Sequence, residues 1–269
     1  METLPPILLL GAGRMGGAML AGWRERGLAS SFIVDPAPAA AALAGGAVQV
    51  VASAGDLPAE FNPAAVVLAV KPQQADAVLP GLRCFANGGA VTLSIMAGRT
   101  IGGLQAVLGA SVAVVRAMPN TPAAIRQGIT VACPGPGMTP AQRDLCDGLL
   151  TSVGEVAWVD DEGLIDAVTA VSGGGPAYVF LLAELLERAA AEQGIPAPLA
   201  RQLARVTVAG SGALLAASSE DASALRIAVT SPAGTTERAL AVLMADAAWP
   251  ALVSRAIDAA TRRSRELAK

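Results

Sequence analysis

The sequence predicts an α/β fold with a doubly wound, mostly parallel sheet, followed by an all-helical domain. Short apolar runs alternate with helical patterns over the first 160 residues, a glycine-rich turn follows the first run, and no convincing strand occurs from Glu162 onwards. The chain has 269 residues, 53% of them hydrophobic, which is enough for two domains of ordinary size. We expect the domains to span residues 1–160 and 161–269.

Eight short apolar runs are the predicted strands of the first domain, and helical patterns fill the intervals between them. The clearest helical patterns are Met15–Arg26, Gln73–Cys84 and Pro140–Ser152. The predicted strands are Ile7–Leu10, Phe32–Asp35, Val48–Ala52, Ala65–Val70, Ala90–Ile95, Val112–Ala117, Gly128–Cys133 and Glu155–Val159.

The second domain reads as helices alone. Its predicted breaks are Gly173–Pro176, Gly194–Pro198, Ser218–Ala222 and Ser231–Gly234. The helix expected over Ala200–Ala217 has little polar surface after Arg205. A helix that is apolar nearly all round must be buried, and in so thin a domain this indicates a partner chain. We therefore expect a homodimer formed through the second domain.

Several classes of protein are excluded by composition. The longest membrane candidate, Ala167–Ala183, contains Ser172–Pro176 and falls short of the roughly 18 to 20 residues that a span needs, so no membrane span is expected. The acidic N-terminus lacks the features of a signal peptide, and the net charge of -3 argues against a nucleic-acid partner. Three cysteines without metal-binding or redox spacing predict a reducing cytoplasm and no metal site.

The sequence contains no histidine. This excludes every mechanism that needs an imidazole base, including the Ser-His-Asp hydrolases and the histidine-assisted hydroxy-acid dehydrogenases. Any catalysis must depend on other groups.

A phosphate-binding turn follows the first predicted strand, with the sequence Gly11-Ala12-Gly13-Arg14-Met15-Gly16. In a G-x-G-x-x-G turn the first glycine permits the tight bend, the second lets a pyrophosphate approach the backbone, and the third lets helix and strand pack closely. The helix that begins here offers free N–H groups to the phosphates. The turn therefore predicts dinucleotide binding.

Asp35 ends the second predicted strand, where a carboxylate accepts hydrogen bonds from the adenosine ribose. A carboxylate there repels a 2′-phosphate, and residues 36–40 supply no arginine or lysine to bind one. These residues favour NADH over NADPH. The alternative is that Asp35 only caps the next helix.

Other candidate cofactor residues follow successive strands at the same edge of the sheet. Lys71, the only lysine before Lys269, follows the fourth strand, and it is either a ligand-binding ammonium or a solvated residue at a helix start. Ser94–Gly98 follows the fifth strand. Asn120 follows the sixth, where it could bind the cofactor or form an Asx-turn.

Taken together, several separated motifs resemble the pyrroline-5-carboxylate reductase family over nearly the whole chain. The resemblance implies a Rossmann domain followed by a helical dimerisation domain, often with dimers assembled into rings. It also implies hydride transfer from NAD(P)H to the imine carbon of 1-pyrroline-5-carboxylate, giving L-proline. The motifs are Gly11–Gly16, Ala69–Gln73, Met118–Pro122, Ser172–Tyr178 and Val229–Thr236.

The resemblance assigns substrate binding to the loop of Ser231, Gly234, Thr235 and Thr236. Within this loop we choose Thr236 as the catalytic residue, whose hydroxyl touches the ring nitrogen. Its hydroxyls and backbone N–H groups suit a carboxylate. The alternative is an ordinary helix N-cap, with Glu237 completing a capping box. The chain departs from the family at Gly174, where serine is common, and at Ala233, where a second glycine is common.

Rival functions are separated by single features. A β-hydroxyacid dehydrogenase needs a lysine on a second-domain helix, and Ala177–Gln193 has none. A reductase of another cyclic imine, or a non-catalytic NAD(P)-sensing protein, remains as an alternative. The residues expected to contact NAD(P)H are Leu10, Gly11, Ala12, Gly13, Arg14, Met15, Gly16, Asp35, Ala69, Val70, Lys71, Pro72, Ile95, Met96, Ala97 and Asn120.

Overall fold

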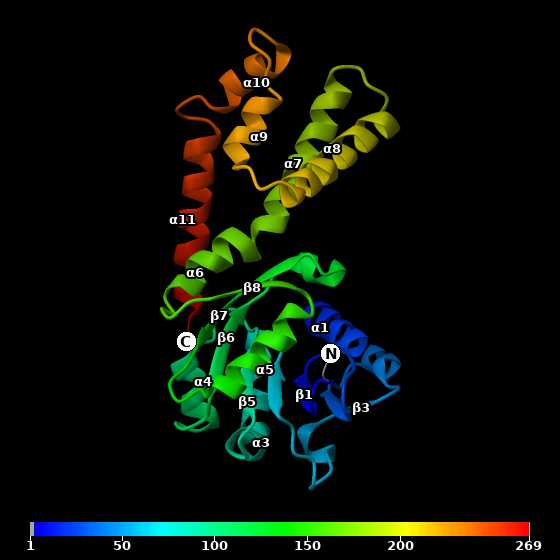
Figure 1. Cartoon of the computed structure of the whole chain (residues 1–269), viewed down its shortest axis with the longest axis vertical. Helices are drawn as coiled ribbons and strands as arrows, with labels where there is room; N and C mark the ends of the chain where they lie inside the picture. The colour runs from blue at the N-terminus through cyan, green and yellow to red at the C-terminus, as the bar shows by residue number, and fades with distance from the viewer. Residues whose placement is uncertain (1–2, 269) are drawn as a thin grey trace. The chain divides into compact units, whose positions relative to one another are not determined.

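A computed structural model describes residues 3–268 (Figure 1). Eight strands form one sheet in the order β3-β2-β1-β4-β5-β6-β7-β8. All eight predicted strands are present, with ends shifted by one or two residues at most. The strands are β1 (Ile7–Leu10), β2 (Ser31–Val34), β3 (Val48–Val51), β4 (Ala65–Leu68), β5 (Val91–Ser94), β6 (Val114–Met118), β7 (Gly128–Pro134) and β8 (Gly154–Trp158).

The sheet is mostly parallel, which confirms the predicted fold class. Strands β1 to β6 run parallel, β7 is antiparallel to β6, and β8 is parallel to β7. The carboxyl ends of β1 to β6 therefore share one edge. The chain leaves β1 in one direction for β2 and β3, then crosses to β4 on the other side. In such open sheets, ligands bind at this switch between β1 and β4.

Helices cover both faces of the sheet. Alternate strand residues point to opposite faces, so Leu9 packs with α1 (Arg14–Arg26) and α5 (Pro140–Thr151), whereas Leu8 packs with helices on the other face. Trp23 of α1 is fully buried, and its Nε1 donates to the Leu149 carbonyl at 2.9 Å. The helices of the other face are α2 (Ala75–Val78), α3 (Arg83–Asn87), α4 (Ile101–Leu108) and α6 (Leu164–Val168).

The prediction of a single helix over Gln73–Cys84 is wrong. Two short α-helices, α2 and α3, alternate there with 3-10 turns at Pro72–Gln74 and Leu79–Leu82. Pro80 stands in the first turn of the second 3-10 segment and has no N–H to continue the α-helical ladder. The apolar residues of this stretch still face the core, since Leu79 and Leu82 are buried.

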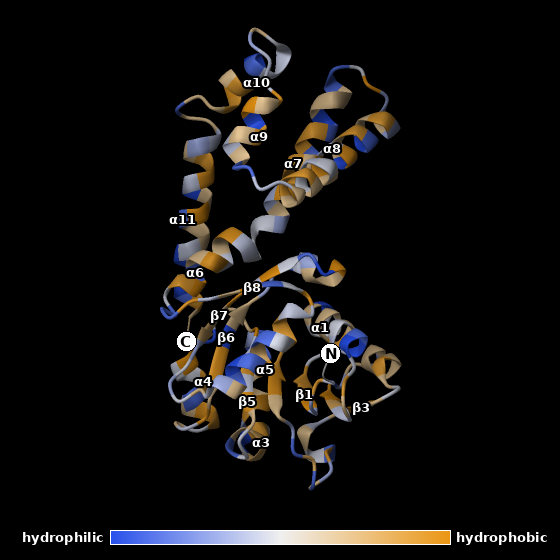
Figure 2. Ribbon diagram, in the orientation of Figure 1, coloured by the Kyte–Doolittle hydropathy of each residue, from blue (hydrophilic) through white to orange (hydrophobic). Residues whose placement is uncertain are grey.

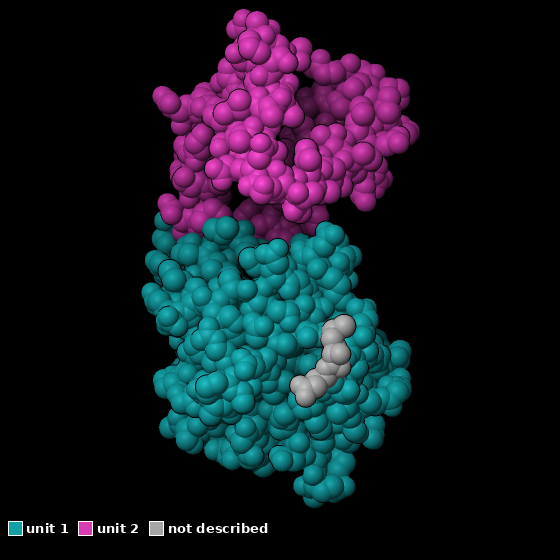
Figure 3. Space-filling model, in the orientation of Figure 1, with its two compact units in different colours: residues 1–173, 260–269 teal, residues 174–259 magenta. Residues whose placement is uncertain are grey.

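The chain divides into two compact units, residues 1–173 with 260–269 as unit 1 and residues 174–259 as unit 2 (Figure 3). The division falls later than the boundary expected near residue 160. The reason is that α6 (Leu164–Val168) packs on the sheet through the buried Ile165. Unit 2 holds α7 (Gly175–Glu192), α8 (Ala197–Ala217), α9 (Ala222–Ala228), α10 (Thr235–Leu243) and the first part of α11 (Trp249–Leu267).

The predicted break at Gly173–Pro176 is present only as a short interruption: the π-helical turn ends at Gly173, Gly174 is the N-cap residue, and α7 begins at Gly175. A π-helical turn at Thr169–Gly173 leads into α7, and the helical stretch runs from Leu164 to Glu192. Pro176 stands in the first turn of α7, where its missing N–H is tolerated. This helical stretch has 29 residues. Over residues 3–268 it is the one helix whose length and composition would allow it to cross a membrane. The length argument against a span is therefore wrong.

Unit 2 has almost no core of its own. Among its described residues only Ala200 and Ala204 are buried. Hydrophobic residues recur along α7 and α8 (Figure 2), and many of them are exposed. Phe180 is 68% exposed and Val206 is 64% exposed. As predicted for the helix over Ala200–Ala217, the apolar surface of α8 lacks cover within the single chain. Exposed apolar side chains gathered on two helices that pack together indicate a surface that binds another molecule.

Candidate active site

The glycine-rich turn has the geometry that its sequence predicts. Gly11 has φ +85°, and a Cβ there would lie 2.9 Å from the Ala69 carbonyl oxygen. A Cβ on Gly16 would lie 2.2 Å from the Gly11 carbonyl oxygen, so this position also excludes a side chain. Gly13 has open space around its missing Cβ, and no side chain caps α1. The backbone at the start of α1 is therefore accessible to a phosphate, as a dinucleotide requires.

Asp35 is tied to two backbone groups. Its Oδ2 accepts from the Ala12 N–H at 2.8 Å, and its Oδ1 accepts from the Ala37 N–H at 2.9 Å. The following 3-10 helix, Pro38–Leu43, has Ala37 as its N-cap residue and no side-chain cap. The alternative role of Asp35 as a helix cap is therefore wrong. Each carboxylate oxygen retains a further lone pair that could accept from another donor.

The loops after β1, β4 and β5 lie side by side at the carboxyl edge. Ala69 N–H donates to the Leu10 carbonyl at 2.8 Å, and Ile95 N–H donates to the Leu68 carbonyl at 3.0 Å. The structure thus brings the predicted cofactor residues of these three loops together. Lys71 is exposed, and no ion pair among the described residues involves it.

Asn120 joins three segments of unit 1. Its Oδ1 accepts from the Ile129 N–H at 3.0 Å, and its Nδ2 donates to Ser172 Oγ at 3.2 Å. These partners differ from those of an Asx-turn, in which the side chain binds the backbone two residues on. Sequence reasoning missed this bond to the π-helical turn because Asn120 and Ser172 are 52 residues apart.

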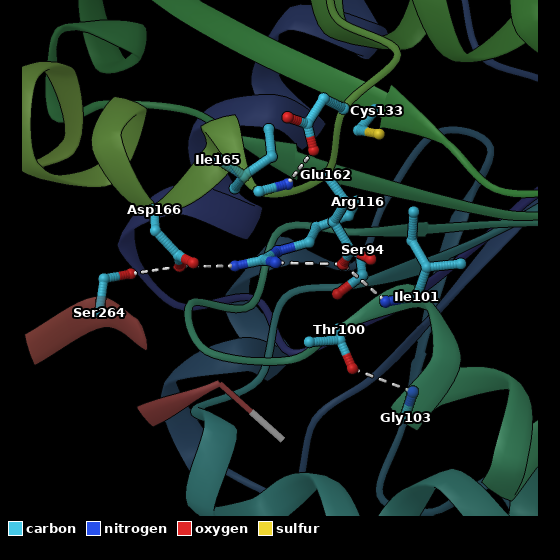
Figure 4. Close-up of polar contacts among 12 residues, drawn as sticks. Ser94, Thr100, Ile101, Gly103, Arg116, Cys133, Glu162, Ile165, Asp166 and Ser264 are labelled. Carbon is cyan, nitrogen blue, oxygen red and sulfur yellow. Dashed lines mark hydrogen bonds and ion pairs between the residues drawn. The ribbon is translucent and has the colours of Figure 1, made fainter. Parts of the chain in front are cut away.

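A buried ion-pair cluster near the same edge was also missed. Arg116 of β6 is 2% exposed and pairs with Glu162 at 3.0 Å and with Asp166 at 3.3 Å (Figure 4). Ser264 donates to Asp166 at 2.7 Å. Burial raises the pKa of the neighbouring Cys133 thiol, and the carboxylate of Glu162 raises it further. An arginine within an apolar strand pattern was the one signal that the sequence offered.

The predicted substrate loop is exposed and precedes α10 in unit 2. Gly234 is the N-cap residue and carries no side-chain cap, so the first-turn residues Thr235 and Thr236 keep their hydroxyls uncommitted to capping. Glu237 reaches past the cap and accepts from the Ala233 N–H at 2.8 Å. The alternative of an ordinary Ser/Thr N-cap is therefore wrong. The loop presents hydroxyls and helix N-terminal N–H groups, which suit an anionic ligand.

Ala233 has φ +58°, a left-handed conformation that favours glycine. The neighbouring Gly234 is required for space, since a Cβ there would lie 2.9 Å from the Ser231 carbonyl oxygen. The loop is thus held in one tight shape by local sterics and by Glu237.

These features define an oxidoreductase of the class that uses NAD(P)H. A family profile described as "Pyrroline-5-carboxylate reductase dimerisation" matches residues 162–267, and one described as "NADP oxidoreductase coenzyme F420-dependent" matches residues 6–98. The chain belongs to the pyrroline-5-carboxylate reductase family, as three relatives make plain.

The pyrroline-5-carboxylate reductase of Pseudomonas aeruginosa is 39% identical, over 99% of this chain and 98% of the relative. The solved structure of the Coxiella burnetii enzyme is 30% identical, covers 99% of both chains and has a TM-score of 0.90. The Plasmodium falciparum enzyme, solved with NADP bound, is 25% identical, covers 100% of both chains and has a TM-score of 0.84. These likenesses confirm the family resemblance seen in the sequence motifs.

Proposed function

We propose that this chain transfers a hydride from NAD(P)H to the imine carbon of 1-pyrroline-5-carboxylate and produces L-proline. The observation that carries the proposal is the uncapped first turn of α10, with Thr235 and Thr236 on it. A substrate carboxylate finds there the N–H donors and the positive end of a helix dipole. Family membership, established above, supports the same reaction.

The reaction makes few demands on acid–base groups. The bound dinucleotide supplies the hydride. The protonated imine already carries a positive charge, so addition of hydride yields a neutral amine and no alkoxide needs an acid. The chain's task is to orient the ring and hold its carboxylate, which is catalysis by proximity and electrostatic preorganisation. A chain without histidine can perform it.

Each loop residue has a proposed role. The N–H groups at the start of α10, with Ser231 and Thr235, hold the substrate carboxylate, and Gly234 leaves the backbone open to it. The Thr236 hydroxyl binds the ring nitrogen and fixes the face that receives the hydride. The left-handed Ala233 and the Glu237 carboxylate keep this loop in shape.

The cofactor lies along the carboxyl edge of the sheet in this proposal. Its pyrophosphate binds at Gly11–Gly16, and its adenosine ribose binds the free lone pairs of Asp35, which favours NADH over NADPH. The loops of residues 69–72 and 95–97 line the path of the nicotinamide half. Asn120 acts mainly by bracing this edge through Ser172 and Ile129.

A second copy of the chain covers the apolar surface of unit 2. This occupant is favoured over a membrane because the matched dimerisation profile spans residues 162–267, which include all of unit 2. The family resemblance implies that such dimers assemble further into rings. We place the enzyme in the cytoplasm, in keeping with its three unpaired cysteines.

The test is to mix the protein with NADH or NADPH and 1-pyrroline-5-carboxylate and to follow the absorbance of the reduced nicotinamide. Decay that depends on substrate, with proline as the product, supports the proposal. Binding of the dinucleotide without turnover would indicate a sensor, and turnover only with a different cyclic imine would change the substrate.

A further inference from the structure

The end of α11 returns to unit 1 and lies directly on the loop after β5. Gly98 in that loop has φ +70°, and a Cβ on it would lie 2.8 Å from the carbonyl oxygen of Leu267. Backbone packs on backbone here, since no side chain separates the two segments. The loop of residues 95–100, which we call the β5–α4 loop, contains three of the residues expected to contact the dinucleotide.

A second contact anchors the same helix end. The Ser264 hydroxyl donates to Asp166 Oδ1 at 2.7 Å, and the same oxygen accepts from Arg116 at 3.3 Å (Figure 4). Ser264 is 7% exposed and Arg116 is 2% exposed. Buried polar groups that lose a partner are costly, so these bonds fix the end of α11, which belongs to unit 1.

The cluster continues to the far end of the loop. Arg116 donates to Glu162 Oε1 at 3.0 Å, and this oxygen accepts from the Ile101 N–H at 2.8 Å. Ile101 is the first residue of α4 and directly follows the β5–α4 loop. The loop is therefore supported near its middle by Leu267 and at its end by a chain of bonds that begins at Ser264.

We propose that the last turns of α11 position the β5–α4 loop for the nicotinamide half of the dinucleotide, with Ser264 as the positioning residue. The inference rests on the proposed assignment of residues 95–97 to cofactor binding. Ser264 itself touches no cofactor; it acts through Asp166, Arg116 and the loop.

Ser264→Ala tests this with Ser254→Ala as the matched control. Ser254 lies on the same helix, but it is exposed and its hydroxyl bonds only the Pro250 carbonyl at 3.0 Å. We expect Ser264→Ala to weaken NADH binding by about three- to tenfold, the size of one buried hydrogen bond, as measured by nicotinamide fluorescence without substrate. Amide hydrogen exchange over residues 95–103 should quicken in the same variant. Ser254→Ala should change neither quantity.

A variant that lacks residues 266–269 removes the Leu267 contact and leaves Ser264 in place. It should also weaken NADH binding and quicken exchange in the β5–α4 loop. A lower Tm with unchanged binding and exchange in both variants would overturn the inference, because the contacts would then be merely structural. Both readouts are independent of turnover. Wild-type protein that binds NADH but does not reduce 1-pyrroline-5-carboxylate would refute the proposed reaction and leave this result intact.

Discussion

The backbone N–H of Ala12 donates a 2.8 Å hydrogen bond to Asp35 Oδ2. The Asp35 carboxylate, which we propose to bind the adenosine ribose, thus also fixes the Gly11–Gly16 turn, which we propose to bind the pyrophosphate. Since one side chain serves both ends of the adenosine half, its loss should affect cofactor choice and overall cofactor affinity together.

Replacement of Asp35 by alanine should raise the ratio of kcat/KM with NADPH to kcat/KM with NADH, because the charge that repels a 2′-phosphate is removed. The KM for both cofactors should rise, because Ala12 and Ala37 lose their acceptor. Steady-state kinetics with each cofactor measure both effects. The control is Asp144→Ala, which removes an exposed charge on α5. An unchanged ratio would show that Asp35 does not contact the ribose.

Thr236→Ala should lower turnover by about 10- to 1,000-fold, the range for the loss of one positioned donor. Thr236→Ser keeps the hydroxyl and should recover most of the rate. Because Thr236 caps no helix, the Tm of Thr236→Ala should stay close to that of the wild type. Equal kcat/KM values for wild type and Thr236→Ala would remove this hydroxyl from the mechanism.

Ala233→Gly should stabilise the protein by up to about 1 kcal/mol, because glycine adopts φ +58° without the steric penalty of a Cβ. Thermal unfolding measures the change. The opposite control is Ala21→Gly in the middle of α1, which should destabilise by about 1 kcal/mol. If Ala233→Gly also destabilises, the left-handed conformation is not the one that the loop adopts in solution.

Only Cys84 should react quickly with a thiol reagent in the native protein, because Cys133 and Cys146 are buried.

Burial, followed by the charge of Asp147, raises the pKa of the Cys146 thiol from 9.0 to about 12. A raised pKa means that this thiol stabilises the fold fully below about pH 9 and loses its contribution as the pH rises towards about 12. Denaturant unfolding over this alkaline range should show a steeper loss of stability in wild type than in Cys146→Ala. Equal slopes would place the Cys146 thiol in contact with water.

The strands and the glycine-rich turn could be predicted from the sequence because both depend on local residues. Continuous apolar runs specify buried strands, and the G-x-G-x-x-G spacing specifies a turn whose steric reasons the structure reproduces at Gly11 and Gly16. At Gly173–Pro176 the sequence indicates a break because glycine and proline usually end helices, whereas the structure has a π-helical turn that ends at Gly173 and an α-helix, α7, that begins at Gly175. Pro176 is tolerated because it stands in the first turn of α7.

The candidate site was only partly predictable for a related reason. Arg116 bonds to Glu162, which is 46 residues away, and Asn120 bonds to Ser172, which is 52 residues away. Sequence spacing carries no signal for such contacts. The shape of the loop before α10 depends in turn on a backbone angle at Ala233, which composition does not reveal.

The near absence of buried side chains in unit 2 has a consequence for how the protein should be handled. A monomer would expose Phe180, Val206 and Val242 to water. Dilution, which favours the monomer, should therefore destabilise the folded state. The midpoint of thermal unfolding should then climb with protein concentration, and folding of the helical half and pairing of two copies should be a single event.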